Sequence, residues 1–62
     1  MRTPRAAEIA RILRHDLGYH NGIRYARGIA RTARMNGSPM AAEYTDAAEI
    51  LEQQQSERET GE

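Results

Sequence analysis

Residues 19–35 read Tyr-His-Asn-Gly-Ile-Arg-Tyr-Ala-Arg-Gly-Ile-Ala-Arg-Thr-Ala-Arg-Met, and this stretch decides the fold. Its four arginines recur at spacings of three and four residues, so on a helix they share one stripe about 80° wide. We call this set the arginine stripe: Arg24, Arg27, Arg31 and Arg34. The other side is mostly apolar and carries Tyr19, Gly22, Ile23, Tyr25, Ala26, Ile29, Ala30 and Ala33. The stretch therefore predicts an amphipathic helix, which we expect over residues 22–35.

A shorter helix is predicted before this stretch, over residues 4–17. Thr3 is a typical N-cap residue, and Pro4 suits the first helical position. Apolar residues then recur at helical spacing as far as Leu17. Gly18 follows at the place where a glycine in the left-handed conformation commonly ends a helix, so we expect the helix to end there.

The segment Asn36-Gly37-Ser38-Pro39 is the strongest helix-breaking signal in the chain. Asn36 or Gly37 ends the preceding helix, and Ser38 caps a third helix that we expect over residues 39–55. So short a connection predicts an antiparallel helical hairpin. Residues 56–62 have nothing to bury and are expected to form a disordered acidic tail. The prediction is one all-α domain over residues 1–55, in which a short N-terminal helix packs on the hairpin, three helices together.

The composition predicts a small core. The chain has 62 residues, ten of them alanine, and no cysteine, tryptophan or phenylalanine. Chains of this size bury only about 60% of the surface that the unfolded chain exposes. We therefore expect a homo-oligomer, most simply a dimer, whose interface lies on the apolar side of the hairpin. Its predicted residues are Ile29, Ala33, Met40, Tyr44, Ala47 and Leu51, the last four at the alternating spacing of a coiled coil.

Charge is unevenly distributed along the chain, although the net charge is zero. Residues 1–34 contain eight arginines and two acids, whereas residues 35–62 contain one arginine and seven acids. The hairpin would bring the arginine stripe beside the acids of the third helix, which predicts ion pairs that set the register more than the stability. The same stripe also suits an acidic protein surface or the phosphates of a nucleic acid. The sequence leaves these three alternatives open.

No residue pattern points to catalysis or to a cofactor. His15 and His20 lie on either side of the expected break, whereas metal binding on one helix face needs ligands four residues apart and a further ligand. The chain has no glycine-rich phosphate loop and no paired nucleophile and base. We therefore predict no enzyme activity, metal, cofactor or small-molecule substrate. No apolar run approaches the ~20 residues of a membrane span, so we expect no membrane contact and a cytoplasmic location.

These features favour a small, non-enzymatic helical interaction protein. We expect it to act as a regulator or inhibitor by docking onto a protein target, as a homodimer. The predicted binding residues are Arg24, Arg27, Arg31, Arg34 and Tyr25. The alternative is a nucleic-acid-binding regulator whose arginine stripe contacts phosphates. In its length and its content of alanine and arginine, the chain resembles small accessory proteins of phages.

Overall fold

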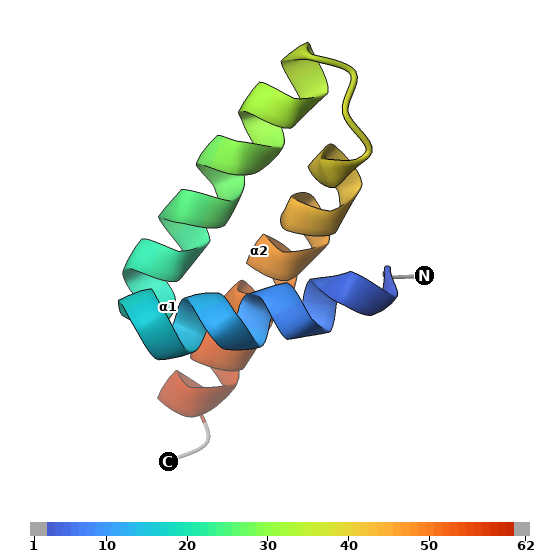
Figure 1. The fold of residues 1–62 in the computed structure, drawn as a ribbon. Coiled ribbons are helices and arrows are strands. Elements are labelled where there is room, and N and C mark those ends of the chain that lie inside the picture. Colours follow the sequence, from blue (N-terminus) through green and yellow to red (C-terminus); the bar gives the residue numbers. More distant parts are fainter. Residues whose placement is uncertain (1–2, 61–62) are drawn as a thin grey trace.

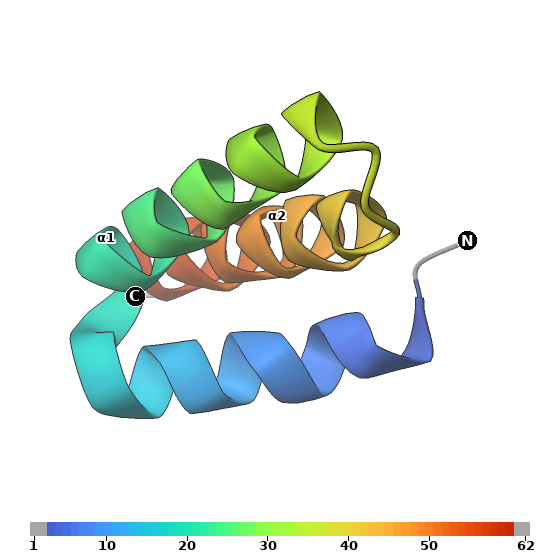
Figure 2. The ribbon, with the colours of Figure 1, turned by 45° about the horizontal axis from the view of Figure 1, so that its top comes forward.

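The chain folds into two helices, the first of which is sharply bent. In the computed structural model, which describes residues 3–60, helix α1 spans Pro4–Met35 and helix α2 spans Met40–Thr60. Helix α1 is kinked at Gly18, and we call residues 4–17 its first arm and residues 19–35 its second arm. The second arm runs antiparallel to α2, and the first arm crosses α2 (Figure 1, Figure 2). The described residues contain no strand, so the all-α prediction is confirmed, but the three expected helices are two.

Gly18 explains why the two arms belong to one kinked helix. Its backbone angles, φ 82° and ψ 176°, lie in a region that is essentially restricted to glycine. The left-handed conformation that we expected has a similar φ but a ψ near +47°, so the break in helical geometry occurs at the expected residue with a different ψ. The chain turns at this one residue, and helical geometry resumes at once. Residues 19–21 are therefore helical, and the expected helix start at residue 22 is corrected.

The connection between α1 and α2 has the expected geometry. Gly37 adopts a left-handed conformation, with φ 69°. The N–H groups of Gly37 and Ser38 donate hydrogen bonds to the carbonyl oxygens of Arg34, at 3.2 Å, and Ala33, at 2.8 Å, which satisfies the end of the helix. The N–H of Met40 donates to Oγ of Ser38 at 3.2 Å, so Ser38 caps α2 as predicted. The antiparallel helical hairpin is thus confirmed.

The core between the two arms and α2 is built from small residues. Apart from Leu13 and Leu51, every buried hydrophobic residue that the structure describes is an alanine: Ala6, Ala10, Ala26, Ala30, Ala33, Ala47 and Ala48. At Gly22 the helices approach so closely that a Cβ would lie 3.3 Å from Cδ1 of Leu51 and 3.4 Å from the carbonyl oxygen of Leu13. Small side chains at the contact reduce the distance between helix axes. The core is therefore thin, and Leu51 is its largest fully buried side chain.

The start of α1 is attached to α2. The N–H of Thr3 donates a hydrogen bond to Oδ2 of Asp46 at 3.1 Å. The expected side-chain cap from Thr3 is absent, and its Oγ1 is buried without a partner among the described residues. A carboxylate at this position favours the helix because the N-terminal end of a helix carries partial positive charge. Asp46 thus binds the N–H of the N-cap residue itself, which differs from the expected cap, in which the Thr3 side chain would accept an N–H of the first helical turn.

Helix α2 is longer than expected. Residues 56–60, which we expected to be disordered, form its last turns. The guanidinium of Arg58 lies over the ring of Tyr19, 5.2 Å from the ring centre, and so joins this end of α2 to the start of the second arm. Gln53 and Glu57, four residues apart on α2, form a side-chain hydrogen bond of 3.5 Å that supports the same turns. The last two residues of the expected tail, 61 and 62, lie outside the described part of the chain.

Candidate protein-docking groove

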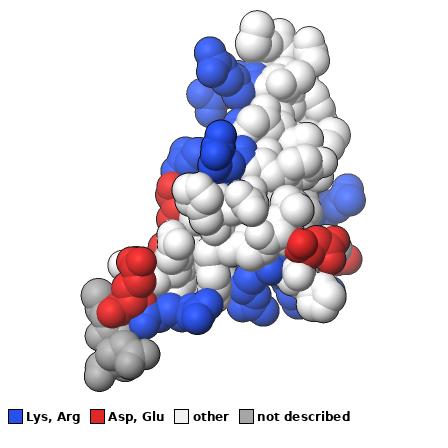
Figure 3. Space-filling model, turned by 90° about the vertical axis from the view of Figure 1, so that its left-hand side faces the viewer, with Lys and Arg blue, Asp and Glu red and all other residues white. Residues whose placement is uncertain are grey.

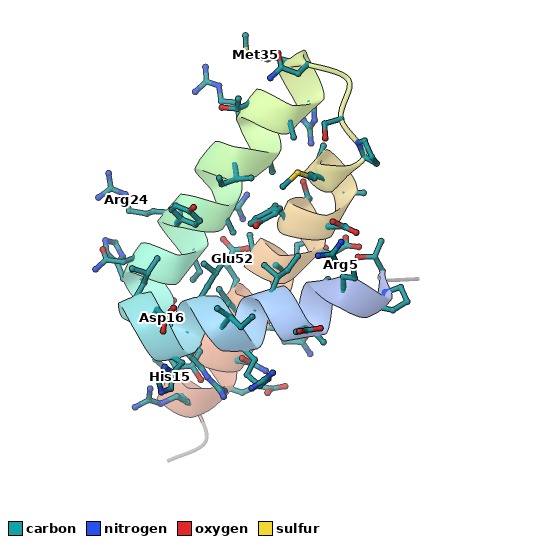
Figure 4. All side chains as sticks on the ribbon, in the orientation of Figure 1. Arg5, His15, Asp16, Arg24, Met35 and Glu52 are labelled. Carbon is teal, nitrogen blue, oxygen red and sulfur yellow. The ribbon has the colours of Figure 1, made fainter. Side chains whose placement is uncertain are left out.

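Most of the arginine stripe is not paired with the acids that the structure describes. Arg27 forms an ion pair and a hydrogen bond with Glu52 of α2. Arg24, Arg31 and Arg34 are exposed, and no ion pair joins them to an acid among residues 3–60. Figure 4 shows Arg24 pointing outward from the second arm. The self-paired arrangement is therefore found at one arginine of the four.

The rotation of the second arm about its axis explains this difference. Arg27 neighbours buried Ala30 on the helix surface, and from there it reaches α2. The hydrogen bond to Glu52, with the attraction of the same carboxylate, raises the pKa of Arg27. Both side chains remain about half exposed, so the pair stabilises the fold by no more than about 1 kcal/mol. Arg31 and Arg34 line the same surface hollow as Arg27, but the residue of α2 that they meet there is Thr45, which carries no charge.

A groove of about 570 Å³ lies beside the arginine stripe, along the second arm and the connection to α2. Its lining is Arg24, Tyr25, Gly28, Ile29, Thr32, Ala33, Asn36, Ser38 and Met40. Tyr25 is 50% exposed, Met40 is 43% exposed, and no acid contributes to the lining. Figure 3 shows the outer side of the second arm, where arginines border a large uncharged area. The groove thus combines exposed apolar side chains with a cationic rim.

The lining includes a glycine in the middle of a helix. A Cβ at Gly28 would have no atom within 4 Å, and the φ angle of this residue is not positive, so nothing within the described chain requires a glycine here. A glycine in a helix interior costs about 1 kcal/mol relative to alanine. Gly22, in the same arm, differs because it is buried against Leu51. The missing side chain of Gly28 therefore leaves open space in the groove, and Gly28 makes no close contact with the core.

The residues predicted for an oligomer interface fall into two groups. The first group lies in the core of the single chain or packs against it: Ala33, Tyr44, Ala47 and Leu51. The coiled-coil spacing therefore marks the contact of α2 with α1, and these side chains are not available to a second copy. The second group lines the groove, together with two of the predicted binding residues: Ile29, Met40, Arg24 and Tyr25.

Several lining residues were not predicted from the sequence as site residues. They are Gly28, Thr32, Asn36 and Ser38. The first three follow Arg24 at spacings of four residues, which places them on one line along the helix. A search for a mixed face between the arginine stripe and the apolar side would have found this line.

The titratable residues form no buried cluster. Nδ1 of His15 lies 3.1 Å from Oδ1 of Asp16, and both side chains are largely exposed. Residues 3–60 contain no group of three or more His, Cys, Asp or Glu that could hold a metal ion. No polar or charged residue in this range is buried. The groove itself combines apolar side chains with the positive charge of Arg24.

Comparison with protein-family models, with curated proteins and with solved structures gave no match for this chain. Neither of the helices in the described range has the length and apolar character that crossing a membrane requires. Function is therefore inferred from the groove and the arginines beside it.

Proposed function

We propose that this chain is a non-enzymatic protein-docking module that regulates or inhibits a target protein by holding one of its segments in the groove. The supporting observation is the juxtaposition of exposed Tyr25 and Met40 with the unpaired Arg24 in a groove of about 570 Å³. Burial of apolar surface on binding contributes roughly 25 cal/mol per Å² before the costs of association. Tyrosine and arginine are also enriched among the residues that dominate protein interfaces.

The character of the groove favours a protein segment over a small molecule. Sites for small molecules combine an enclosed apolar cavity with a few fixed polar groups that orient the ligand. Here the polar side chains of the lining, such as Arg24, Thr32 and Asn36, are exposed to solvent. An open, largely apolar groove with a charged border matches the usual anatomy of a protein interface.

We take the target to be another protein rather than a second copy. A symmetric dimer joined through the groove would bring Arg24 of both copies toward the same interface, and like charges across an interface are unfavourable. Most of the apolar residues that we expected to support a dimer, Leu51 among them, are used within the chain. We therefore propose that the chain meets its target as a monomer.

Nucleic acid is a second candidate, supported by the unpaired Arg24, Arg31 and Arg34. These side chains suit phosphates, and the exposed ring of Tyr25 suits stacking on a base. If the arginines bind phosphates, the affinity should fall steeply as salt is added. For duplex DNA, the logarithm of the binding constant falls by about 0.9 per phosphate contact for each tenfold increase in salt concentration. Docking of an apolar segment predicts a much weaker dependence on salt.

Selection from a library of randomised helical peptides tests the proposal. Peptides enriched on the folded chain should lose at least about tenfold in affinity for the variants Ile29→Ser and Tyr25→Ser, because both lose an apolar contact in the groove. The matched control is Ile12→Ser, since Ile12 is also exposed but lies on the first arm, and it should bind as the parent does. Circular dichroism verifies that each variant is folded. Equal binding to all four proteins would refute a groove-dependent function.

A further inference from the structure

We infer that the groove takes an amphipathic α-helix that carries acidic side chains along the flank facing Arg24 and Arg31. This inference rests on the proposed function and specifies its ligand.

The groove has the length and the walls that suit a helix. It follows the second arm from Arg24 to Asn36, which at 1.5 Å per residue is about 18 Å, or roughly three helical turns. An extended peptide gains affinity by pairing its backbone with the free edge of a sheet, and the described residues contain no strand. A helix satisfies its own backbone hydrogen bonds and presents apolar side chains three and four residues apart. The groove therefore favours a helical ligand.

Gly28 permits a close approach of that helix. It lies one turn from Arg24 and from Thr32 along the groove, with open space where its Cβ would be. Helix axes pack about 8–10 Å apart, and the smaller values need small residues at the crossing point. A ligand helix that crosses the second arm at Gly28 can therefore contact Tyr25 and Ile29 on the same side.

The charge of the border determines the charge of the ligand. Arg24 lines the groove and Arg31 follows seven residues later on the adjoining stripe, so the two Cα atoms are about 10.5 Å apart along the axis. No acid lines the groove, and neither arginine forms an ion pair with a described residue. Carboxylates two turns apart on a ligand helix match this spacing. The complementary ligand is thus both apolar and acidic.

A second copy of the chain does not present such a helix. The acidic residues between 40 and 60 lie on α2, whose apolar side is buried against α1 of its own chain. The large apolar side chains exposed on the first arm, Ile12 and Leu17, have Arg11 and Arg14 nearby as well as Asp16, so the charge beside them is mixed and not acidic overall. The first arm carries three arginines against two acids, so a second copy would bring net positive charge toward Arg24. The occupant is therefore a helix of a different protein.

Three synthetic peptides serve as probes. Each is a stapled helix of about 14 residues, or four turns, with leucines on one face. They differ only at two flanking positions seven residues apart, which are glutamate, lysine or glutamine. Titration of the isotope-labelled chain, followed by amide NMR, gives both the affinity and the location of binding.

The glutamate peptide should bind at the groove amides, about tenfold more tightly than the lysine peptide, with the glutamine peptide between them. Arg24→Glu should reverse this order, because the rim then repels glutamate and attracts lysine. The matched control is Arg14→Glu, which makes the same change of net charge on the exposed first arm and should preserve the order.

The other outcomes separate this inference from the proposed function. Equal binding of the three peptides at the groove would overturn the acidic ligand and leave the docking function standing. Groove shifts caused by an extended peptide or a single-stranded oligonucleotide, but by no helical peptide, would overturn the helix. Groove shifts that depend on protein concentration without any peptide would assign the groove to a second copy.

Discussion

Replacement of Gly28 by alanine is expected to stabilise the fold and to weaken binding in the groove. The substitution adds one methyl group at a site where the structure has no atom within 4 Å, so it introduces no clash. In a helix interior alanine is favoured over glycine by about 0.8–1.0 kcal/mol. The exposed methyl adds no contact within the chain, so the expected gain in the free energy of unfolding is about 0.5–1 kcal/mol.

Gly22 provides the matched control, because it lies in the same arm and is replaced by the same residue. A Cβ at Gly22 would lie 3.3 Å from Cδ1 of Leu51 and 3.4 Å from the carbonyl oxygen of Leu13. Cδ1 of Leu51 would have to move by a few tenths of an ångström, and Leu51 is fully buried, so crowding offsets the gain in helix propensity. Gly22→Ala is therefore expected to leave the stability unchanged or to lower it.

Urea denaturation followed by circular dichroism measures both variants under the same conditions. In thermal denaturation of a domain of this size, a stabilisation of about 1 kcal/mol corresponds to a rise in Tm of roughly 4–8 °C. If Gly28→Ala does not stabilise the chain, the conclusion that Gly28 has open space around its Cβ position is wrong. If it stabilises the chain but the glutamate peptide binds as before, the inferred close approach of a ligand helix at Gly28 is wrong.

Three further predictions concern the fold. Leu51→Ala removes the largest fully buried side chain, and at about 2–5 kcal/mol it should leave so small a domain largely unfolded by circular dichroism; a folded variant with an unchanged midpoint would contradict the assigned core. Gly18→Ala should lower the free energy of unfolding by about 1–3 kcal/mol in a urea titration, through backbone strain alone, since no atom lies within 4 Å of the Cβ position. A cycle of Arg27→Ala, Glu52→Ala and the double variant should give a coupling energy below about 1 kcal/mol that decreases as salt is added; a larger, salt-independent coupling would show that this pair is shielded from solvent.

The hairpin was predictable because its signals are local. Gly37 and Ser38 act within one turn of the helix ends: one supplies the positive φ and the other the capping oxygen. The kink at Gly18 was predicted only in position. A local signal marks Gly18 as a break, but the direction of the turn is not a local property, because both arms pack on α2, where Gly22 lies close to Leu51.

Long-range contacts account for the remaining differences. The end of α2 is ordered through the contact of Arg58 with the ring of Tyr19, which no pattern within residues 56–62 reveals. The coiled-coil spacing identifies the side of α2 that packs on a helix, but not whether that helix belongs to the same chain. Which arginines of the stripe form ion pairs depends on the orientation of the second arm about its own axis. This orientation brings only Arg27 to an acid of α2.

The groove itself follows from the small core. Alanines bring the two arms and α2 so close together that few large side chains fit between them, and Leu51 is the largest that is fully enclosed. The larger apolar residues of the second arm and of the start of α2, Tyr25 and Met40 among them, are consequently left on the surface. Their exposure does not stabilise the chain, since apolar surface in water is unfavourable. Their exposure beside Arg24, which has no ion pair within residues 3–60, is the basis of our proposal that a partner covers this surface.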